Sequence, residues 1–192
     1  MHSIIQQSID TSDKNIHSLD MFYIIGLGNP GDEYGKSRHN AGRMAVEQFE
    51  ARNSKHEIRN VKIIESGEFM NNSGKAVAKI IKSKKAAENL IVVYDDIDLP
   101  LGTIKISYNK SSGGHNGLES VIKAVKTREF TRIRIGVSPK KKPSGEEAVL
   151  KFLLGDFRKP ELEILKKVFK RVAEAIEVIV EEGRDKAMNE YN

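Results

Sequence analysis

The side chains best suited to chemistry near neutral pH are one histidine and one acidic cluster. His39 stands in RHNAG (38–42), and Asp95, Asp96 and Asp98 stand in YDDIDLPLG (94–102). An imidazole can accept a proton from water at neutral pH, and a carboxylate can fix its tautomer and stabilise its charged form. The pattern therefore predicts a His–Asp general base, although a single loop histidine is also an ordinary surface residue.

Amides and glycines stand in three further motifs. GLGNPG (26–31) contains Asn29, FMNNSG (69–74) contains Asn71, and SSGGHNGLES (111–120) contains His115 and Asn116. Amides can hold a water molecule and a carbonyl group, and paired glycines let backbone approach a substrate closely. These motifs predict a polar site around the histidine.

Each of these motifs also has a purely structural interpretation. Asn40, one asparagine of FMNNSG, and Asn116 with Glu119 have the positions of helix N-caps. GNPG is typical of a tight turn. The same glycines match G-x-G-x-x-G, but Pro30 and a polar stretch intervene before any helix, which disfavours a dinucleotide site.

The absence of certain residue types and motifs limits the reaction mechanisms that are possible. The chain has no cysteine and no G-x-S-x-G motif, so a thiol nucleophile is excluded and a serine elbow is absent. His39, His115 and the three acids could together bind a metal, but no H-x-H or H-E-x-x-H spacing supports that alternative. Direct attack by water, assisted by a His–Asp base, fits the residue set better than an acyl-enzyme route.

Alternating strands and helices must position these side chains. The hydrophobic pattern predicts strands over residues 22–27, 61–66, 89–96, 103–108 and 132–138. It predicts helices over residues 42–52, 73–83, 117–126 and 160–182. This order indicates a single α/β domain with a mixed, mostly parallel, twisted sheet flanked by helices, and ligands of such sheets bind beyond the carboxyl ends of the strands.

Composition fits a globular protein of 192 residues with a net charge of +5. No apolar run approaches the roughly 18 residues that a membrane span requires, and a basic balance is compatible with a nucleic-acid partner. Residues 1–20 lack the basic start and apolar stretch of a signal peptide, and their acids are atypical of a transit peptide. We expect a flexible N-terminal extension over residues 1–20 and the domain over residues 21–192.

The motifs in their order resemble the bacterial-type peptidyl-tRNA hydrolase family. GLGNPG, Tyr34 and RHNAG are followed by FMNNSG, DDIDLPLG, GGHNGL, FTRIRIG and FLLGDF, so that the resemblance covers nearly all of residues 21–190. It implies a monomeric cytoplasmic enzyme, without metal or cofactor, that hydrolyses the ester between peptide and tRNA and recycles the tRNA.

The resemblance also implies roles for individual residues. His39 and Asp95 match the catalytic pair. The substrate-binding positions of the family correspond to Asn29, Tyr34, Asn71, His115 and Asn116. Contacts to tRNA phosphates are expected from Lys105, Arg132 and Arg134, with Lys110 and Lys140, Lys141 and Lys142 as further candidates, unless that lysine loop is only a solvated turn.

Three departures from the family pattern are visible. The stretch between RHNAG and FMNNSG is short, so we expect a trimmed sheet edge there. Ser107 stands where the family has a lysine that clamps phosphate, and the first twenty residues have no counterpart. Two other functions remain open on the sequence: an RNA-binding member of the fold that has lost its activity, and a metal-dependent hydrolase.

Overall fold

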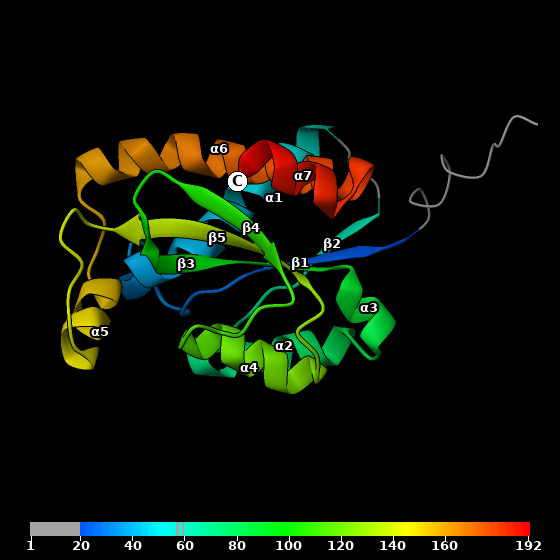
Figure 1. The fold of residues 1–192 in the computed structure, drawn as a ribbon, viewed down its shortest axis with the longest axis horizontal. Helices are drawn as coiled ribbons and strands as arrows, with labels where there is room; N and C mark the ends of the chain where they lie inside the picture. The colour runs from blue at the N-terminus through cyan, green and yellow to red at the C-terminus, as the bar shows by residue number, and fades with distance from the viewer. Residues whose placement is uncertain (1–19, 57, 59) are drawn as a thin grey trace, which may run out of the picture.

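Five strands form one twisted sheet in the computed structural model, which describes residues 20–56, 58 and 60–192 (Figure 1). The strands are β1 (Phe22–Gly26), β2 (Val61–Ile63), β3 (Leu90–Pro100), β4 (Ile104–Tyr108) and β5 (Thr131–Ser138). Their order is β2-β1-β3-β5-β4, and only the pairing of β4 with β5 is antiparallel. The predicted mixed, mostly parallel sheet is therefore confirmed, whereas the extension over residues 1–20 lies almost wholly outside the described residues.

Helices cover both faces of the sheet (Figure 1). One layer contains α1 (Ala41–His56), α6 (Lys159–Glu182) and α7 (Arg184–Tyr191), and the other contains α2 (Ser73–Ile80), α3 (Lys84–Glu88) and α4 (Asn116–Val125). A further helix, α5 (Glu146–Leu154), stands at one end. Alternate strand residues face the two layers: Ile91 and Val93 of β3 join one apolar core, and Val92 joins the other.

The carboxyl ends of the parallel strands lead into irregular loops with short 3-10 turns. These turns are η1 (Asp32–Tyr34), η2 (Arg38–Asn40) and η3 (Met70–Asn72). The turn η2 leads directly into α1, which crosses β3 so closely that a Cβ added at Gly42 would overlap the carbonyl oxygen of Val93. Only glycine allows this approach, which brings the preceding turn to the carboxyl half of β3.

Several elements differ from their sequence-based predictions. The strand predicted over residues 89–96 is longer in the structure, because β3 continues to Pro100 with a register shift after Asp96, so that Asp98 also lies within the strand. The strand predicted over residues 132–138 begins one residue earlier as β5, which is buried along most of its length and lies between β3 and β4 in the sheet. The helices α3, α5 and α7 were not predicted, and β2 is a three-residue edge strand in the segment expected to be trimmed.

Candidate active site

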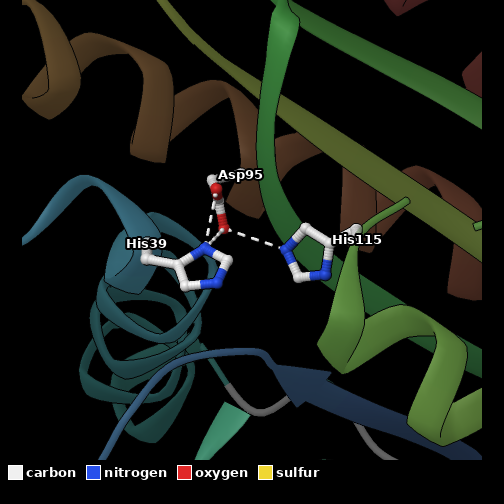
Figure 2. Close-up of side chains that lie close together, drawn as sticks. All are labelled: His39, Asp95 and His115. Atoms are coloured by element: carbon white, nitrogen blue, oxygen red, sulfur yellow. Dashed lines mark hydrogen bonds and ion pairs between the residues drawn. The ribbon is translucent and has the colours of Figure 1, made fainter. Parts of the chain in front are cut away.

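Three separate elements bring His39, Asp95 and His115 together (Figure 2). His39 comes from the turn η2, Asp95 from the carboxyl half of β3, and His115 from the residue before α4. The Nδ1 atom of His39 lies 3.0 Å from both carboxylate oxygens of Asp95, and the Nε2 atom of His115 lies 3.1 Å from Asp95 Oδ1. One buried carboxylate therefore accepts hydrogen bonds from two imidazole rings.

The hydrogen-bond partners define the tautomer of each ring. His115 is the N-cap of α4, and its Nδ1 atom accepts the N–H of Leu118 at 3.2 Å, so its proton must be on Nε2, which faces Asp95. The carboxylate can only accept, so His39 presents Nδ1–H to it. The Nε2 atom of neutral His39 then carries a lone pair and can accept a proton. The cap predicted for Asn116 is provided by His115 instead.

Electrostatic interactions keep the carboxylate of Asp95 ionised. Burial disfavours the charged form of Asp95, but the charges of His39 and His115 and their hydrogen bonds hold its pKa well below the usual range. Burial alone would lower the pKa of His39, but the charge of Asp95 and the hydrogen bond to it outweigh burial and raise that pKa. Asp95 thus orients His39 and makes it a stronger base.

A network of amides fixes Asn29 beside the turn of His39. The backbone N–H of Asn29 donates to Asn40 Oδ1 at 2.8 Å, and Asn40 Nδ2 donates to the carbonyl of Asn29 at 2.9 Å. Asn40 therefore joins two loops and does not cap α1. The N–H of Met70 donates to Asn29 Oδ1 at 2.8 Å, so the side-chain oxygen is occupied. The amide NH₂ of Asn29 has no partner within the described part of the chain and can donate to a ligand.

The other expected substrate contacts lie around this centre. Asn71, in η3, and Asn116, the first residue of α4, are exposed, and neither side chain has a hydrogen bond among the described residues. Asn72 occupies the N-cap position of α2 without a side-chain cap bond. Tyr34 is half-buried, with its ring edge-on to that of Phe69 at 6.4 Å between centroids.

A cleft of about 610 Å³ opens on His39, Asp95 and His115. One wall is apolar and comes from α5, with Val149, Leu150 and Leu153. The lining also contains the basic side chains of Lys105 and Arg134. Asn29, Tyr34 and Asn71 lie outside this cleft lining, on the neighbouring loops, so the structure gathers only part of the expected site in one cavity.

The two arginines of β5 differ in what they can bind. Arg132 is completely buried, its guanidinium donates to the carbonyls of Lys110 and Ser111, and it lies over the ring of Phe130. It holds the glycine loop before His115, which does not fit the expected direct contact to phosphate. Arg134 is one-quarter exposed and donates to Asp96 at 2.6 Å, so it still faces the cleft.

The comparison with known families decides the identity of the chain. A family model described as peptidyl-tRNA hydrolase matches residues 23–192. The chain belongs to the peptidyl-tRNA hydrolase family. A peptidyl-tRNA hydrolase from Fervidobacterium nodosum is 42% identical over 181 residues, which cover 88% of this chain and 94% of the relative. One from Thermodesulfovibrio yellowstonii is 39% identical over 189 residues, which cover 90% and 99%.

Solved structures of this hydrolase family share the fold. The crystal structure of the peptidyl-tRNA hydrolase from Acinetobacter baumannii has a TM-score of 0.77 and 27% identity, and the match covers 90% of this chain and 94% of that chain. The expectations of a hydrolase and of an α/β fold are therefore confirmed. None of the described helices is both long and apolar enough to cross a membrane.

The three site residues of this hydrolase could in principle hold a metal, because their ligand atoms lie within 4.8 Å of one another. The hydrogen bonds argue for a different use. A metal on Nε2 of His115 would require a proton on Nδ1, which already accepts the N–H of Leu118. Binding would therefore break the N-cap bond of α4 and replace the hydrogen bond between His115 and Asp95. The geometry fits a proton-transfer network better than a metal centre.

Sequence reasoning missed one residue that builds the site, Arg38. Its guanidinium is buried, donates to Gly155 O at 3.0 Å, contacts Glu161 at 2.9 Å, and lies over the ring of Phe152. It ties the turn that carries His39 to the end of α5 and the start of α6. Sequence spacing did not show this, because the partners are more than a hundred residues away.

Tyr94 and the apolar wall of α5 were also missed. The Tyr94 ring lies edge-on to His115 at 5.0 Å, and burial raises the pKa of its hydroxyl to about 12. This phenol therefore remains protonated in the pH range where His39 titrates. The spacing of Val149, Leu150 and Leu153 in EEAVLKFLL is an amphipathic pattern that could have indicated a helix with one apolar face.

Proposed function

We propose that the chain hydrolyses the ester between a peptide and tRNA by direct attack of water, with His39 as general base and Asp95 as its orienting carboxylate. The observation that carries the proposal is that Asp95 occupies Nδ1 of His39, which leaves Nε2 free to accept a proton. His115, bonded to the same carboxylate, helps to hold it in place.

The steps balance without any other reactant. His39 Nε2 takes a proton from water as the water oxygen bonds to the ester carbonyl carbon. The resulting oxyanion is stabilised by donors that already point at it, for which the free amide NH₂ of Asn29 is the candidate. When the tetrahedral intermediate collapses, the bond to the ribose oxygen breaks and the protonated imidazole returns its proton to that oxygen. The products are a peptide acid and free tRNA.

The surrounding residues are proposed to hold the two halves of the substrate. The amides of Asn71 and Asn116, which have no partner among the described residues, could bind the peptide backbone, and the half-buried ring of Tyr34, which packs against Phe69, offers an apolar contact. The apolar wall of α5 suits peptide side chains. Lys105, which is exposed, and Arg134 are proposed to contact phosphates of the tRNA.

We further propose that the enzyme acts in the cytoplasm as a monomer and without metal. The hydrogen bonds of the two histidines support metal-free chemistry, because Nδ1 of His39 and both ring nitrogens of His115 are already engaged, and the remaining Nε2 of His39 is the atom proposed to accept the proton. The proposed substrate, peptidyl-tRNA, is a product of translation, which supports the cytoplasm as the location of the enzyme.

The test is release of an N-acetylated amino acid from tRNA by the wild type and by His39→Ala, each with and without a chelator. We expect release by the wild type, no effect of the chelator, and loss of most turnover in His39→Ala with binding of deacylated tRNA retained. A wild type that binds tRNA without hydrolysis would favour an inactive RNA-binding protein. Loss of activity with the chelator would favour a metal-dependent hydrolase.

A further inference from the structure

The helix α5, which forms the apolar wall of the cleft, is attached to the rest of the protein mainly through the turn that carries His39. None of its residues is fully buried, and Leu150 and Leu154 are 50% and 39% exposed. Among the described helices, strands and turns, η2 is the element on which α5 packs most extensively. The wall and the proposed general base therefore belong to one packed unit.

A short backbone pairing joins the two segments of this unit. Residues 36–38, which lead into His39, run antiparallel to residues 155–157, which follow α5. The N–H of Arg38 donates to Gly155 O at 3.1 Å, and the N–H of Phe157 donates to Lys36 O at 2.9 Å. This pairing holds the C-terminal end of α5 against η2.

The side chain of Arg38 completes the joint between α5 and η2. Its Nη1 atom donates to the carbonyls of Phe152 and Gly155 at 3.4 and 3.0 Å, and its guanidinium carbon lies 4.4 Å from the centroid of the Phe152 ring. Its Nη2 atom donates to Glu161 at 2.9 Å, and Glu161 also accepts the N–H of Arg158 at the start of α6. A planar guanidinium with several donors in a rigid fork can hold these segments at a fixed geometry.

The start of α5 has a weaker attachment. Lys142, in the loop before the helix, pairs with Asp98 of β3, but both side chains are largely exposed. Exposed ion pairs contribute little to stability, because water screens the charges and two long side chains must be ordered. The position of α5 relative to His39 therefore depends mainly on Arg38 and Phe152.

We propose that Arg38 is a positioning residue that holds the apolar wall of α5 at a fixed place relative to His39, so that a large apolar side chain on the esterified amino acid increases the rate of hydrolysis. The inference rests on the proposed function, because the ester must lie at His39. The side chain next to the ester carbonyl is then the part of the peptide nearest to Leu150 and Leu153, which line the same cleft. A wall that is fixed relative to the base orients the carbonyl for attack, whereas a loosely held wall contributes only affinity.

The experiment compares two esters of the same tRNA, one with N-acetyl-phenylalanine and one with N-acetyl-glycine. Single-turnover hydrolysis over a range of enzyme concentrations gives a saturating rate and a half-saturating concentration for each ester. Phe152→Leu keeps an apolar side chain but removes the ring that contacts Arg38. Leu150→Ser removes part of the wall, and Leu154→Ser is the matched control, since Leu154 is exposed on the same helix but does not line the cleft.

We expect the wild type and Leu154→Ser to hydrolyse the phenylalanine ester about tenfold faster than the glycine ester at saturation, which is within the discrimination that an apolar pocket provides. In Phe152→Leu this rate ratio should fall below about threefold, because the wall no longer orients the ester, while the ratio of half-saturating concentrations stays as in the wild type. Both ratios should fall in Leu150→Ser. Arg38→Lys should behave as Phe152→Leu at a temperature where circular dichroism shows that it is folded.

Partial unfolding would not produce this result, because it lowers the active fraction equally for both esters and leaves their rate ratio unchanged. Equal saturating rates of the wild type on the two esters would overturn the inference and leave the proposed function intact. A rate ratio in Phe152→Leu equal to that of the wild type, or an equal fall in Leu154→Ser, would also overturn it. A wild type that hydrolyses neither ester would refute the proposed function and the inference with it.

Discussion

Replacing Asp95 by Asn tests how the two histidines share one carboxylate. Asp95 accepts from Nδ1 of His39 at 3.0 Å and from Nε2 of His115 at 3.1 Å. The cap bond from Leu118 fixes the His115 proton on Nε2, so the single side-chain oxygen that remains in Asp95→Asn is drawn to His115. The new amide NH₂ then faces Nδ1 of His39 and favours the tautomer protonated on Nε2, which cannot act as a base.

The magnitude follows from the loss of general-base catalysis. Such catalysis contributes about 10²–10⁴-fold, so kcat should fall by that factor, or about 2.7–5.4 kcal/mol in barrier height. The pKa of His39 should also fall, because burial would remain while the charge that raises that pKa is gone. The rate requires neutral His39, so the acid limb of the pH–rate profile should move to lower pH.

The assay is single-turnover hydrolysis of N-acetyl-aminoacyl-tRNA from pH 5 to pH 9, with binding of deacylated tRNA measured in parallel. Asp98→Asn is the matched control, since Asp98 is exposed and pairs with Lys142. Asp98→Asn should retain kcat within about threefold. If Asp95→Asn also retained it, or if its acid limb moved to higher pH, the proposed role of Asp95 would be refuted.

Four further predictions test parts of the structure. Arg38→Lys should destabilise the fold by about 2–4 kcal/mol in urea unfolding, because it disrupts the buried ion pair with Glu161. Arg158→Ala should destabilise it much less, because the guanidinium of Arg158 is exposed. Equal effects of the two variants would contradict the proposed structural role of Arg38. Gly42→Ala should cost about 2–4 kcal/mol and lower kcat, because its Cβ would overlap Val93 O; an unchanged unfolding midpoint would contradict the close contact. Lys105→Gln should raise KM and reduce the salt slope of tRNA binding by about one. Arg132→Gln should lower kcat without changing that slope, because Arg132 holds the loop before His115. A reduced slope in Arg132→Gln would show that Arg132 does contact phosphate. His115→Asn should keep the α4 cap and move the acid limb to higher pH, because Asp95 loses a donor; a shift to lower pH would be inconsistent with the shared carboxylate.

The sequence allowed the fold to be predicted where periodicity is strong. A continuous apolar run predicted β3, because a central strand is buried on both faces of the sheet. An apolar stripe at helical spacing predicted α6, because one side of that helix is buried. The short helices α3 and α7 were missed because their residues are mostly polar and exposed. The extension of β3 to Pro100 depends on pairing with β5, which no local pattern reveals.

For the candidate site, motifs identified residue types but not hydrogen-bond partners. The pairing of His39 with Asp95 was predicted, and the two side chains do lie in contact. The second bond of Asp95, to His115, and the cap that fixes the His115 tautomer depend on the start of α4 in three dimensions. The burial of Arg132 could not be predicted either, because the sequence gives no sign that the carbonyl groups of Lys110 and Ser111 bind its guanidinium.

The most direct test of the central claim compares the single-turnover rate with the titration of His39 itself. Wild-type enzyme labelled with ¹⁵N-histidine would be followed by NMR across the pH range, and hydrolysis of N-acetyl-aminoacyl-tRNA would be measured at each pH. We predict that His39 titrates above its ordinary value, is protonated only on Nδ1 when neutral, and that the rate rises with its neutral fraction. A rate that is independent of this titration, or a neutral His39 protonated on Nε2, would contradict the proposed mechanism.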